Sequence, residues 1–441
     1  MTEHERDDRA ASAAAGSVQP PPYEGDPDAP TLPGDDAALK RRRMAFMVLL
    51  TGTVCLGMGQ TIVFAALPPV ARELGLSEMQ TGAIFSISAI LWVIASPYWG
   101  RLSDRVGRRR IILTGLTGFV VSLLLFAGAI RAGLTGWATP LIVYGTMIAT
   151  RCVYGLIGAA APAASQAYIA DRTSAAERTS ALAGFTAAFG FGQMLGPGFA
   201  SAVAIFGLLA PFYAMAVVGA LVAAFVFLKL PEKSRPIART RKKRNLSVFD
   251  PRIRSFLGFG YFTGFAMSVP LQATAFYIID RFALEPAAAA QLVGVALTAS
   301  SMAALFSQLV LVQRYRLSPR TLMRLSPIIT ALAHALIAIS PAYGPLVFGL
   351  MASGLGLGMA QPGFGGATSL AVRPDEQGAA AGLINAAGAA GFASAPFIAF
   401  ALYDYAPSAP FLFTSGLMTL LAIFAWRSKA IAGAANENAA D

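Results

Sequence analysis

The eleven residues from Gly100 to Arg110 read GRLSDRVGRRR and combine five arginines, one aspartate and two glycines. They stand between two apolar runs, 80–100 and 110–130, and each run is long enough to cross a bilayer, which takes about 20 residues. Positive charge alone would keep such a connection on one side of a membrane. Topology requires neither Asp104 nor the glycines, so the stretch predicts a short, structured connection between two spanning helices.

The rest of the chain repeats this alternation of apolar runs and short polar connections. It is 56% hydrophobic and 13% charged, whereas a soluble domain carries about 25% charged residues. We therefore predict an all-α integral membrane protein with twelve transmembrane helices. The predicted spans are 44–71, 80–100, 110–130, 139–168, 179–206, 211–229, 255–279, 288–312, 321–340, 343–371, 378–403 and 408–427.

The distribution of Lys and Arg predicts the orientation. With the N-terminus inside, the outer connections hold only Arg72, Arg131 and Arg281, and the other basic residues outside the spans lie on the cytoplasmic side. This asymmetry places both termini in the cytoplasm and requires an even number of spans. The net charge of +11 is distributed in short clusters without aromatic residues between them. We interpret this positive charge as the charge that sets the orientation of the protein in the membrane. We therefore expect no nucleic-acid partner.

The segments outside the spans divide the chain into regions. Residues 1–43 are predicted to be a disordered cytoplasmic tail, since residues 1–39 contain nine acidic residues, six prolines and few large apolar side chains. The first apolar run starts too far from the N-terminus and is too long for a cleaved signal peptide. A basic cytoplasmic linker, 231–254, separates an N-terminal six-helix bundle (44–230) from a C-terminal one (255–428), and 429–441 form a C-terminal tail.

The two predicted bundles resemble each other. Twenty residues separate Glu177 from Pro197 and also Glu376 from Pro396. At this offset Gly192 falls on Gly391, and Gly155 on Gly354. Repeated halves are the usual build of secondary transporters, with the substrate site between them. The alternative is coincidence in a chain rich in Gly and Ala.

The stretch from Gly100 to Arg110 resembles, at every defined position, the signature loop G-x-L-x-D-R-x-G-R-R-R of the major facilitator superfamily. The resemblance implies two six-helix bundles that alternate in access to the two sides of the membrane. It also implies that the loop is a latch, which forms in the outward-open state and breaks on inward opening. The latch residues are Gly100, Asp104, Arg105, Gly107, Arg108 and Asp171. The glycines are expected to permit a tight loop, and the arginines to pair with Asp104 and Asp171.

A second resemblance concerns Arg151 in the fourth span, with Gly155 four residues later. It is similar to the family's Arg-x-x-x-Gly motif, whose arginine is linked to proton transfer. An arginine near the bilayer centre costs several kcal/mol unless it faces a cavity or a partner. The alternative is a structural arginine bonded to backbone carbonyls.

A third resemblance lies in the fifth span, at Gly192, Gly196 and Pro197. The segment is similar to the family's antiporter motif, G-x-x-x-G-P-x-x-G-G, but Ala200 and Ser201 stand where the last glycines would be. The resemblance implies an exporter. The alternative is a packing kink, since small residues four apart let helices approach closely and proline bends a helix.

Further candidates are polar or aromatic residues within the spans. Such side chains face a cavity or another helix. Those expected to line the substrate cavity are Gln60, Trp92, Gln193, Gln272, Tyr277, Gln361 and Asn385. His334 is the one histidine within a span and a candidate for proton coupling together with Arg151. The alternative for His334 is a packed, neutral side chain.

No Asp or Glu lies well inside any predicted span. Exporters of cationic drugs usually need a buried carboxylate, so its absence favours a neutral or anionic substrate. The sequence shows no nucleophile with its base, no metal-ligand cluster and no phosphate-binding loop. We therefore expect no enzyme, no metal and no cofactor other than a coupling proton.

The resemblance is closest to the drug:proton antiporter branch and implies a proton-coupled exporter of a small molecule in the cytoplasmic membrane. We expect a monomer whose partners are the substrate and the lipid bilayer. One alternative is a proton-coupled importer of a metabolite. Another is a non-transporting receptor or scaffold on the same fold, although the retained latch and Arg151 argue against it.

Overall fold

The structure is a computed structural model, and it describes residues 36–171, 173, 175–231, 246–315, 317–373 and 376–433. Most of the predicted N-terminal tail, most of the basic linker and the end of the C-terminal tail lie outside these ranges. The chain divides into two units, Met1–Phe46 and Met47–Asp441.

Helix α2 (Asp36–Glu73) begins earlier than the first predicted span. Residues 36–43 were expected to belong to a disordered tail, but the structure makes them helical. The reason is local, because Ala, Leu, Lys and Arg all favour helix and an aspartate at the first position suits the helix dipole. The cluster Lys40–Arg43 is therefore part of a helix.

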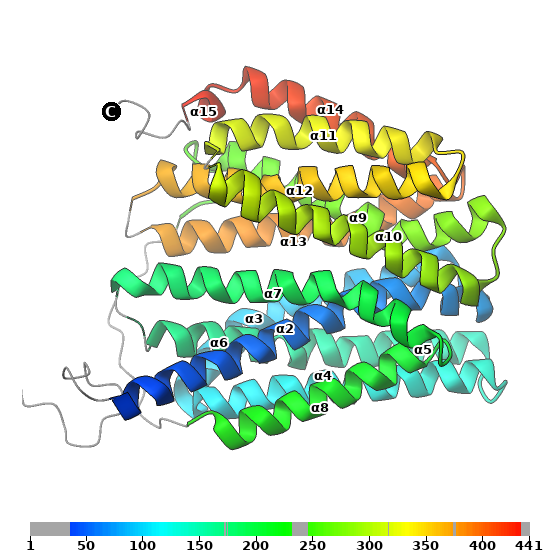
Figure 1. Ribbon diagram of the computed structural model, residues 1–441, viewed down its shortest axis with the longest axis horizontal. Coiled ribbons are helices and arrows are strands. Elements are labelled where there is room, and N and C mark those ends of the chain that lie inside the picture. Colours follow the sequence, from blue (N-terminus) through cyan, green and yellow to red (C-terminus); the bar gives the residue numbers. More distant parts are fainter. Residues whose placement is uncertain are drawn as a thin grey trace, which may run out of the picture. The chain divides into compact units, whose positions relative to one another are not determined.

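Within the second unit we refer to residues 47–230 as the first half and to residues 255–428 as the second half. After α2, the helices of the first half are α3 (Glu78–Val106), α4 (Arg108–Leu134), α5 (Pro140–Val153), the π-helix η1 (Tyr154–Gly158), α6 (Ala160–Asp171), α7 (Ala175–Ala204) and α8 (Ala210–Lys229). Those of the second half are α9 (Arg254–Phe282), α10 (Pro286–Phe306), the π-helix η2 (Ser307–Arg314), α11 (Pro319–Ile339), α12 (Tyr343–Ala371), α13 (Gln377–Tyr403) and α14 (Ala409–Arg427), followed by α15 (Lys429–Ala432). Figure 1 shows α11, α12 and α14 side by side, and α4 beside α8.

Eleven helices in the described part of the chain are long and apolar enough to cross a membrane. Together α5, η1 and α6 make one such span, Pro140–Ile169. Helix α7 has 30 residues and is not among the eleven. No strand occurs in the described ranges, so the all-α prediction is confirmed, and the predicted spans agree with the helices to within a few residues at most ends.

Glycines set the close approach of several helices. A Cβ added at Gly192 of α7 would collide with the carbonyl of Val54 in α2, and one added at Gly391 of α13 with the carbonyl of Tyr261 in α9. A Cβ added at Gly155 would likewise collide with the carbonyl of Ser88 in α3, and one added at Gly354 would collide with the carbonyl of Ser300 in α10. These positions require glycine because the partner is backbone, which cannot turn aside.

Candidate functional site

Arg108, the first residue of α4, is the centre of the signature loop. Its Nε donates to Asp171 Oδ2 at 3.0 Å, and its Nη2 lies 2.9 Å from the same oxygen and also pairs with Asp104. Nη1 donates to Ser103 Oγ and to the carbonyl of Gly100. One guanidinium thus ties α4 to the end of α3 and to the end of α6. Only the several N–H donors of an arginine can serve all these partners at once with a fixed geometry, which a lysine cannot reproduce.

The connection itself is shorter than the sequence suggested. Helix α3 continues to Val106, so only Gly107 lies between α3 and α4, with φ 110°, which favours glycine. Gly100 was expected to help form a tight loop, but it lies inside α3, and a Cβ there would meet nothing within 4 Å. Arg105 is exposed at the helix end, and the pairing falls to Arg108.

Among the residues that the structure describes, Asp104 and Arg108 make no hydrogen bond or ion pair to the second half. The described hydrogen bonds and ion pairs of Asp104 and Arg108 stay within α3, α4 and α6, and the Asp104 side chain is 56% exposed. A partly exposed pair of this kind contributes about 0–1 kcal/mol to folding. The aspartate is therefore available to a partner that this conformation does not provide.

Contacts between the two halves gather at the opposite end of the helices, where α2 ends and α3 begins. They include the ring pair Phe64–Phe392, the packing of Gly82 on Phe400, the hydrogen bond from Ser201 Oγ to the carbonyl of Gln291, and the contact of Gly198 with Thr298. All of these residues except Thr298, which lies just past the middle of α10, are in the part of their helix that is nearer to this end. The structure is therefore closed between the halves at one end.

Arg151 lies at the end of α5, immediately before the π-helix η1, and is 4% exposed. Its guanidinium carbon lies 4.2 Å from the centre of the Tyr154 ring and 6.0 Å from that of Phe126. Its Nε has no hydrogen-bond partner, and no carboxylate pairs with it within the described ranges. Stacking on aromatic faces compensates part of the cost of the buried charge, and the guanidinium keeps unused capacity to donate. The alternative of an arginine bonded to carbonyls has no support in the hydrogen bonds that the structure describes.

Of the other candidates in the first half, Trp92 contacts this group, and Gln60 and Gln193 contact each other. Trp92 of α3 lies 5.1 Å from Tyr154, ring centre to ring centre, and Gly158 of η1 packs beside both rings. Gln193 of α7 donates through Nε2 to Oε1 of Gln60 in α2 at 3.3 Å. The first half therefore supplies a cation with aromatic rings from α3, α4 and η1, and separately an amide pair from α2 and α7. π-Helical turns often occur at functional sites, and here one positions Tyr154.

The GlyPro segment of α7 packs on two sides. Gly192 and Gly196 approach the backbone of α2, and a Cβ at Gly196 would collide with Thr61. Around Pro197 the same helix meets α10 of the second half, where Gly294 fits against the Pro197 carbonyl and Ser201. Its small residues thus permit contact within the first half and between the halves.

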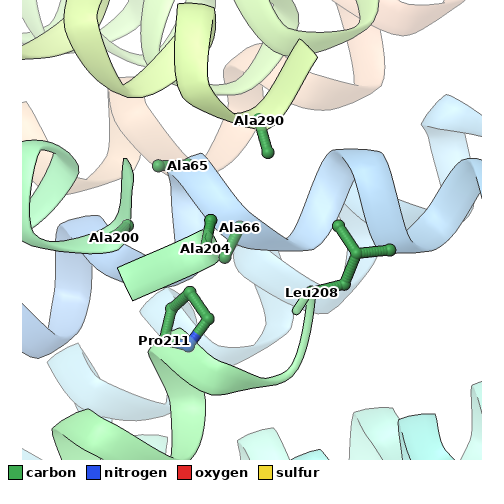
Figure 2. Close-up of a pocket in the computed structure, with 7 residues that line it drawn as sticks. All are labelled: Ala65, Ala66, Ala200, Ala204, Leu208, Pro211 and Ala290. Atoms are coloured by element: carbon green, nitrogen blue, oxygen red, sulfur yellow. The ribbon is translucent and has the colours of Figure 1, made fainter. Parts of the chain in front are cut away.

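The region around this contact contains a small apolar pocket. Figure 2 shows it lined by Ala65, Ala66, Ala200, Ala204, Leu208, Pro211 and Ala290. Alanines from α2, α7 and α10 face one another there, and no polar side chain enters. The pocket therefore marks where small side chains meet and offers nothing to orient a polar substrate.

The second half does not add His334 or Tyr277 to the Arg151 group. His334 is fully buried between α11 and α14, with Nδ1 2.9 Å from the carbonyl of Thr330 and its ring beside Phe411. Tyr277 donates to the carbonyls of Ile337 and Ala338 at the end of α11. Both side chains hold helices of the second half together, which favours the packing alternative.

The remaining candidates lie in different surroundings. Gln272 is 2% exposed, donates to Ser268 Oγ, and leaves its Oε1 without a partner. Gln361 and Asn385 are exposed on α12 and α13. None of these three makes a described contact with the Arg151 group.

Two ionic clusters were not among the predicted site residues. Arg72, at the end of α2, binds Asp280 Oδ2 of the second half at 2.6 Å and also pairs with Glu78. Arg252, just before α9, binds Asp250 and Glu376. The sequence places these residues at helix ends, but pairs 208 and 124 residues apart give no local signal.

The fold and the arginine-centred loop define a multi-pass helical membrane protein. A family model of the Major Facilitator Superfamily matches residues 49–315, and the chain belongs to this family of membrane transporters. Multidrug resistance protein 2 of Bacillus subtilis (strain 168) is 24% identical over 284 residues, which are 62% of this chain and 67% of that protein. The class C tetracycline resistance protein of Escherichia coli is 27% identical over 246 residues, 55% of this chain and 57% of that protein.

Solved structures share the fold. A bacterial homologue of the human lysosomal transporter Spinster, in an inward-facing and occupied conformation, has a TM-score of 0.70 at 13% identity and covers 89% of this chain and 97% of its own. The human organic anion transporter MFSD10 has a TM-score of 0.60 at 20% identity and covers 87% and 99%. At these identities the likeness concerns the fold alone.

Proposed function

We propose that the protein is a proton-coupled exporter of a small neutral or anionic organic molecule, that it works by alternating access, and that both termini are cytoplasmic. The substrate site is formed by Arg151, Trp92, Gln60 and Gln193, with Tyr154 supporting the arginine. One observation supports a neutral or anionic substrate: Arg151 is buried, and no carboxylate among the described residues pairs with it.

We propose twelve spans in two six-helix repeats. Helix α7, with 30 residues, supplies the span beyond the eleven. The glycine contacts support the repeat, since Gly155 meets α3 as Gly354 meets α10, and Gly192 meets α2 as Gly391 meets α9. In each comparison, the contact within the first half and the contact within the second half involve helices at corresponding positions in the two halves.

Alternating access is supported by where the halves meet. They are closed at the Arg72 end, while Asp104 and Arg108 of the latch bind only within the first half. With the N-terminus inside, the closed end faces outward. A latch not engaged between the halves is the arrangement expected of an inward-facing state.

Export is supported by the relatives, which are named for multidrug and tetracycline resistance. It is also supported by the GlyPro segment of α7, which packs against both α2 and α10. The coupling of transport to protons is part of the proposal and rests on the family resemblance.

An anionic or strongly accepting group on the substrate would satisfy the unused donors of Arg151. The coupling ion and the substrate must both bias the same two-state equilibrium. The fixed charge of the Arg151 group is a cation, and an acid would compensate it directly, whereas a permanent cation would add to the cost.

The test is a thermal-shift screen of purified protein against organic acids, neutral compounds and quaternary ammonium compounds, since a ligand that binds the folded state raises its Tm. We expect organic acids to stabilise the protein. Arg151→Lys keeps the charge but loses the planar fork, so it should weaken binding about tenfold, and Arg151→Ala should abolish transport while the protein still inserts. Stabilisation by quaternary ammonium compounds alone would refute the proposed polarity.

A substrate-driven proton flux in proteoliposomes tests the class of function. Such a flux excludes a receptor or scaffold. Its absence, with a ligand that binds and shifts the Tm, would favour the receptor.

A further inference from the structure

An arginine and a tryptophan form a partly exposed pair at one end of the second half. Arg324 lies in the second turn of α11 and Trp426 in the last turn of α14, and Figure 1 shows these two helices side by side. The Arg324 guanidinium carbon lies 4.5 Å from the centre of the Trp426 ring, and the tryptophan is 57% exposed. In the proposed orientation, this end of the helices is cytoplasmic.

The Arg324 guanidinium has donors that the described residues do not use. Its Nε is buried and has no hydrogen-bond partner, and its two Nη groups have no described hydrogen bond or ion pair. The Trp426 ring holds one face of the guanidinium plane by a cation–π contact. The N–H donors lie in the edge of that plane, which the ring does not cover. The arginine is therefore held in place by one residue and is able to bind a further group.

Three more cations belong to the same end of these helices. Arg320 lies four residues before Arg324 and therefore on the same face of α11. Arg427 is the last residue of α14, and Lys429 is the first residue of α15. The side chain of Ile431 is fully buried and fixes α15 against α11 and α14. The structure thus holds four positive charges close to one corner of the second half.

These cations lack a counter-charge among the described residues. Around the second half, the described carboxylates at this end are Asp250 and Glu376, and Arg252 binds both. No ion pair is described for Arg320, Arg324, Arg427 or Lys429. A group of like charges repels itself unless an anion lies nearby. An anion from outside the described chain would therefore be attracted to this corner.

The first half has a related pair that uses its donors internally. At the offset that superposes the two halves, Phe227 falls on Trp426. Arg109, in the first turn of α4, lies with its guanidinium carbon 5.0 Å from the centre of the Phe227 ring. Its Nη2, however, donates to the carbonyl of Phe227. The recurrence indicates that the arrangement belongs to the fold, and the pair of the second half is the one with donors to spare.

The surface beside the pair is apolar, which favours a lipid over a soluble anion. Exposed apolar side chains continue along both helices toward the middle of the membrane, at Leu325 and Leu332 of α11 and at Leu420 and Phe424 of α14. Acyl chains can lie on such a surface, whereas a free phosphate or an acidic peptide would use only the charges. Tryptophan is also enriched at the level of the lipid headgroups.

We propose that Arg324 and Trp426 form the centre of a binding site for the headgroup of an anionic phospholipid. The Arg324 guanidinium donates to the phosphate oxygens, and Trp426 fixes its plane. Arg320, Arg427 and Lys429 add attraction, as basic clusters at the cytoplasmic ends of membrane helices do. The acyl chains lie along α11 and α14. The inference is independent of the transported substrate, the direction of transport and the coupling ion.

Brominated lipids test the site, because bromine quenches the emission of a tryptophan that it contacts. The full chain is reconstituted in bilayers of phosphatidylcholine and phosphatidylglycerol, with bromine on the chains of one lipid at a time. The emission that disappears in Trp426→Phe reports on the site and excludes the other three tryptophans. Both leaflets have the same composition, so the result does not depend on orientation.

The wild type should bind phosphatidylglycerol at Trp426 at least about fivefold more strongly than phosphatidylcholine, and Arg324→Gln should lower this preference about fivefold. The double variant Arg427→Gln with Lys429→Gln should lower it in the same direction. Both of its positions are exposed, so it tests the site even if Arg324→Gln does not fold. Arg314→Gln is the matched control, since it removes an exposed arginine from the same end of η2 and should leave the preference unchanged.

Three results would overturn the site. The first is a wild type that binds the two lipids equally at Trp426. The second is a folded Arg324→Gln whose preference equals that of the wild type or of Arg314→Gln. The third is a preference that inorganic phosphate or soluble polyglutamate abolishes at constant ionic strength, because the cations would then bind a soluble anion or an acidic protein. A preference that persists in the presence of both soluble anions supports the lipid.

Discussion

At the scale of single residues, the protein relies on arginines that each serve several partners. Arg108 joins α3, α4 and α6, Arg72 joins the two halves, and Arg252 ties Asp250 to Glu376. Arg151 differs, because its neighbours are aromatic rings and it has no carboxylate among the described residues. The three paired arginines connect helices, and in the proposed function Arg151 is the one that binds a ligand.

The latch gives the first residue-scale prediction. Asp104→Asn should lower transport at least about tenfold and leave the Tm nearly unchanged, because its exposed pair with Arg108 contributes only about 0–1 kcal/mol in this conformation. Arg108→Gln should lower both, since it also loses the ion pair with the half-buried Asp171. Transport in proteoliposomes and thermal unfolding measure the two effects. Wild-type transport by Asp104→Asn would show that the latch has no role in the cycle.

Arg252 gives a prediction about pH. Its side chain holds the pKa values of Asp250 and Glu376 below their ordinary range through hydrogen bonds. A carboxylate with a lowered folded-state pKa stabilises the fold above its unfolded pKa, and the gain is lost as the pH falls through the folded value. Arg252→Gln should therefore lower the Tm at neutral pH, and the difference should close below about pH 4.

The control for this measurement is Arg254→Gln, a neighbouring exposed arginine for which the described residues provide no ion pair. It should leave the Tm unchanged at every pH. A constant difference between Arg252→Gln and the wild type across the range would mean that packing of the arginine stem, and not charge, is responsible.

At the scale of helices, glycine decides which pairs can touch. In α7, Gly192 faces the backbone of α2, whereas Gly190, two residues earlier, has open space around it. Gly192→Ala should destabilise the protein by about 1–3 kcal/mol, as overpacking does. Gly190→Ala is the matched control and should have little effect or stabilise slightly. Equal Tm values for the two variants would contradict the close α2–α7 contact.

Also at this scale, the connection between α3 and α4 within the signature stretch consists of a single residue, Gly107. Helix α3 runs through Gly100 and Asp104 and stops at Gly107, where φ is 110°. The aspartate and Arg108 thus sit on two rigid helices. This places Asp104 and Arg108 at fixed positions relative to the first half, and in the proposed alternating access they would move with it as one body.

At the scale of the whole transporter, the prediction concerns direction. If the protein exports its substrate in exchange for protons, everted membrane vesicles with an acidic interior should accumulate a substrate identified in the binding screen. Cells that lack the protein should retain that substrate. Uptake by intact cells, together with no uptake by everted vesicles, would establish the importer instead. Vesicles carrying Arg151→Ala are the control for nonspecific accumulation.

What the sequence determined by itself were features that depend on near neighbours along the chain. Apolar run length gave the spans to within a few residues, because each helix must satisfy its own backbone in lipid. The stretch GRLSDRVGRRR indicated that its arginines pair with Asp104 and Asp171, and in the structure Arg108 makes both pairs. The family resemblance followed from the same stretch, and the match over residues 49–315 confirmed it.

Tertiary structure decided what depends on distant segments. The sequence offered His334 beside Arg151 as a coupling group, but the fold buries His334 against Phe411. The sequence placed Arg72 in an outer connection without a partner, and the fold joins it to Asp280 across 208 residues. A polar side chain in a span carries the same sequence signal whether it faces a cavity, a neighbouring helix or the other half. Only the packing of the helices distinguishes these cases, because burial and partner are properties of the assembled bundle.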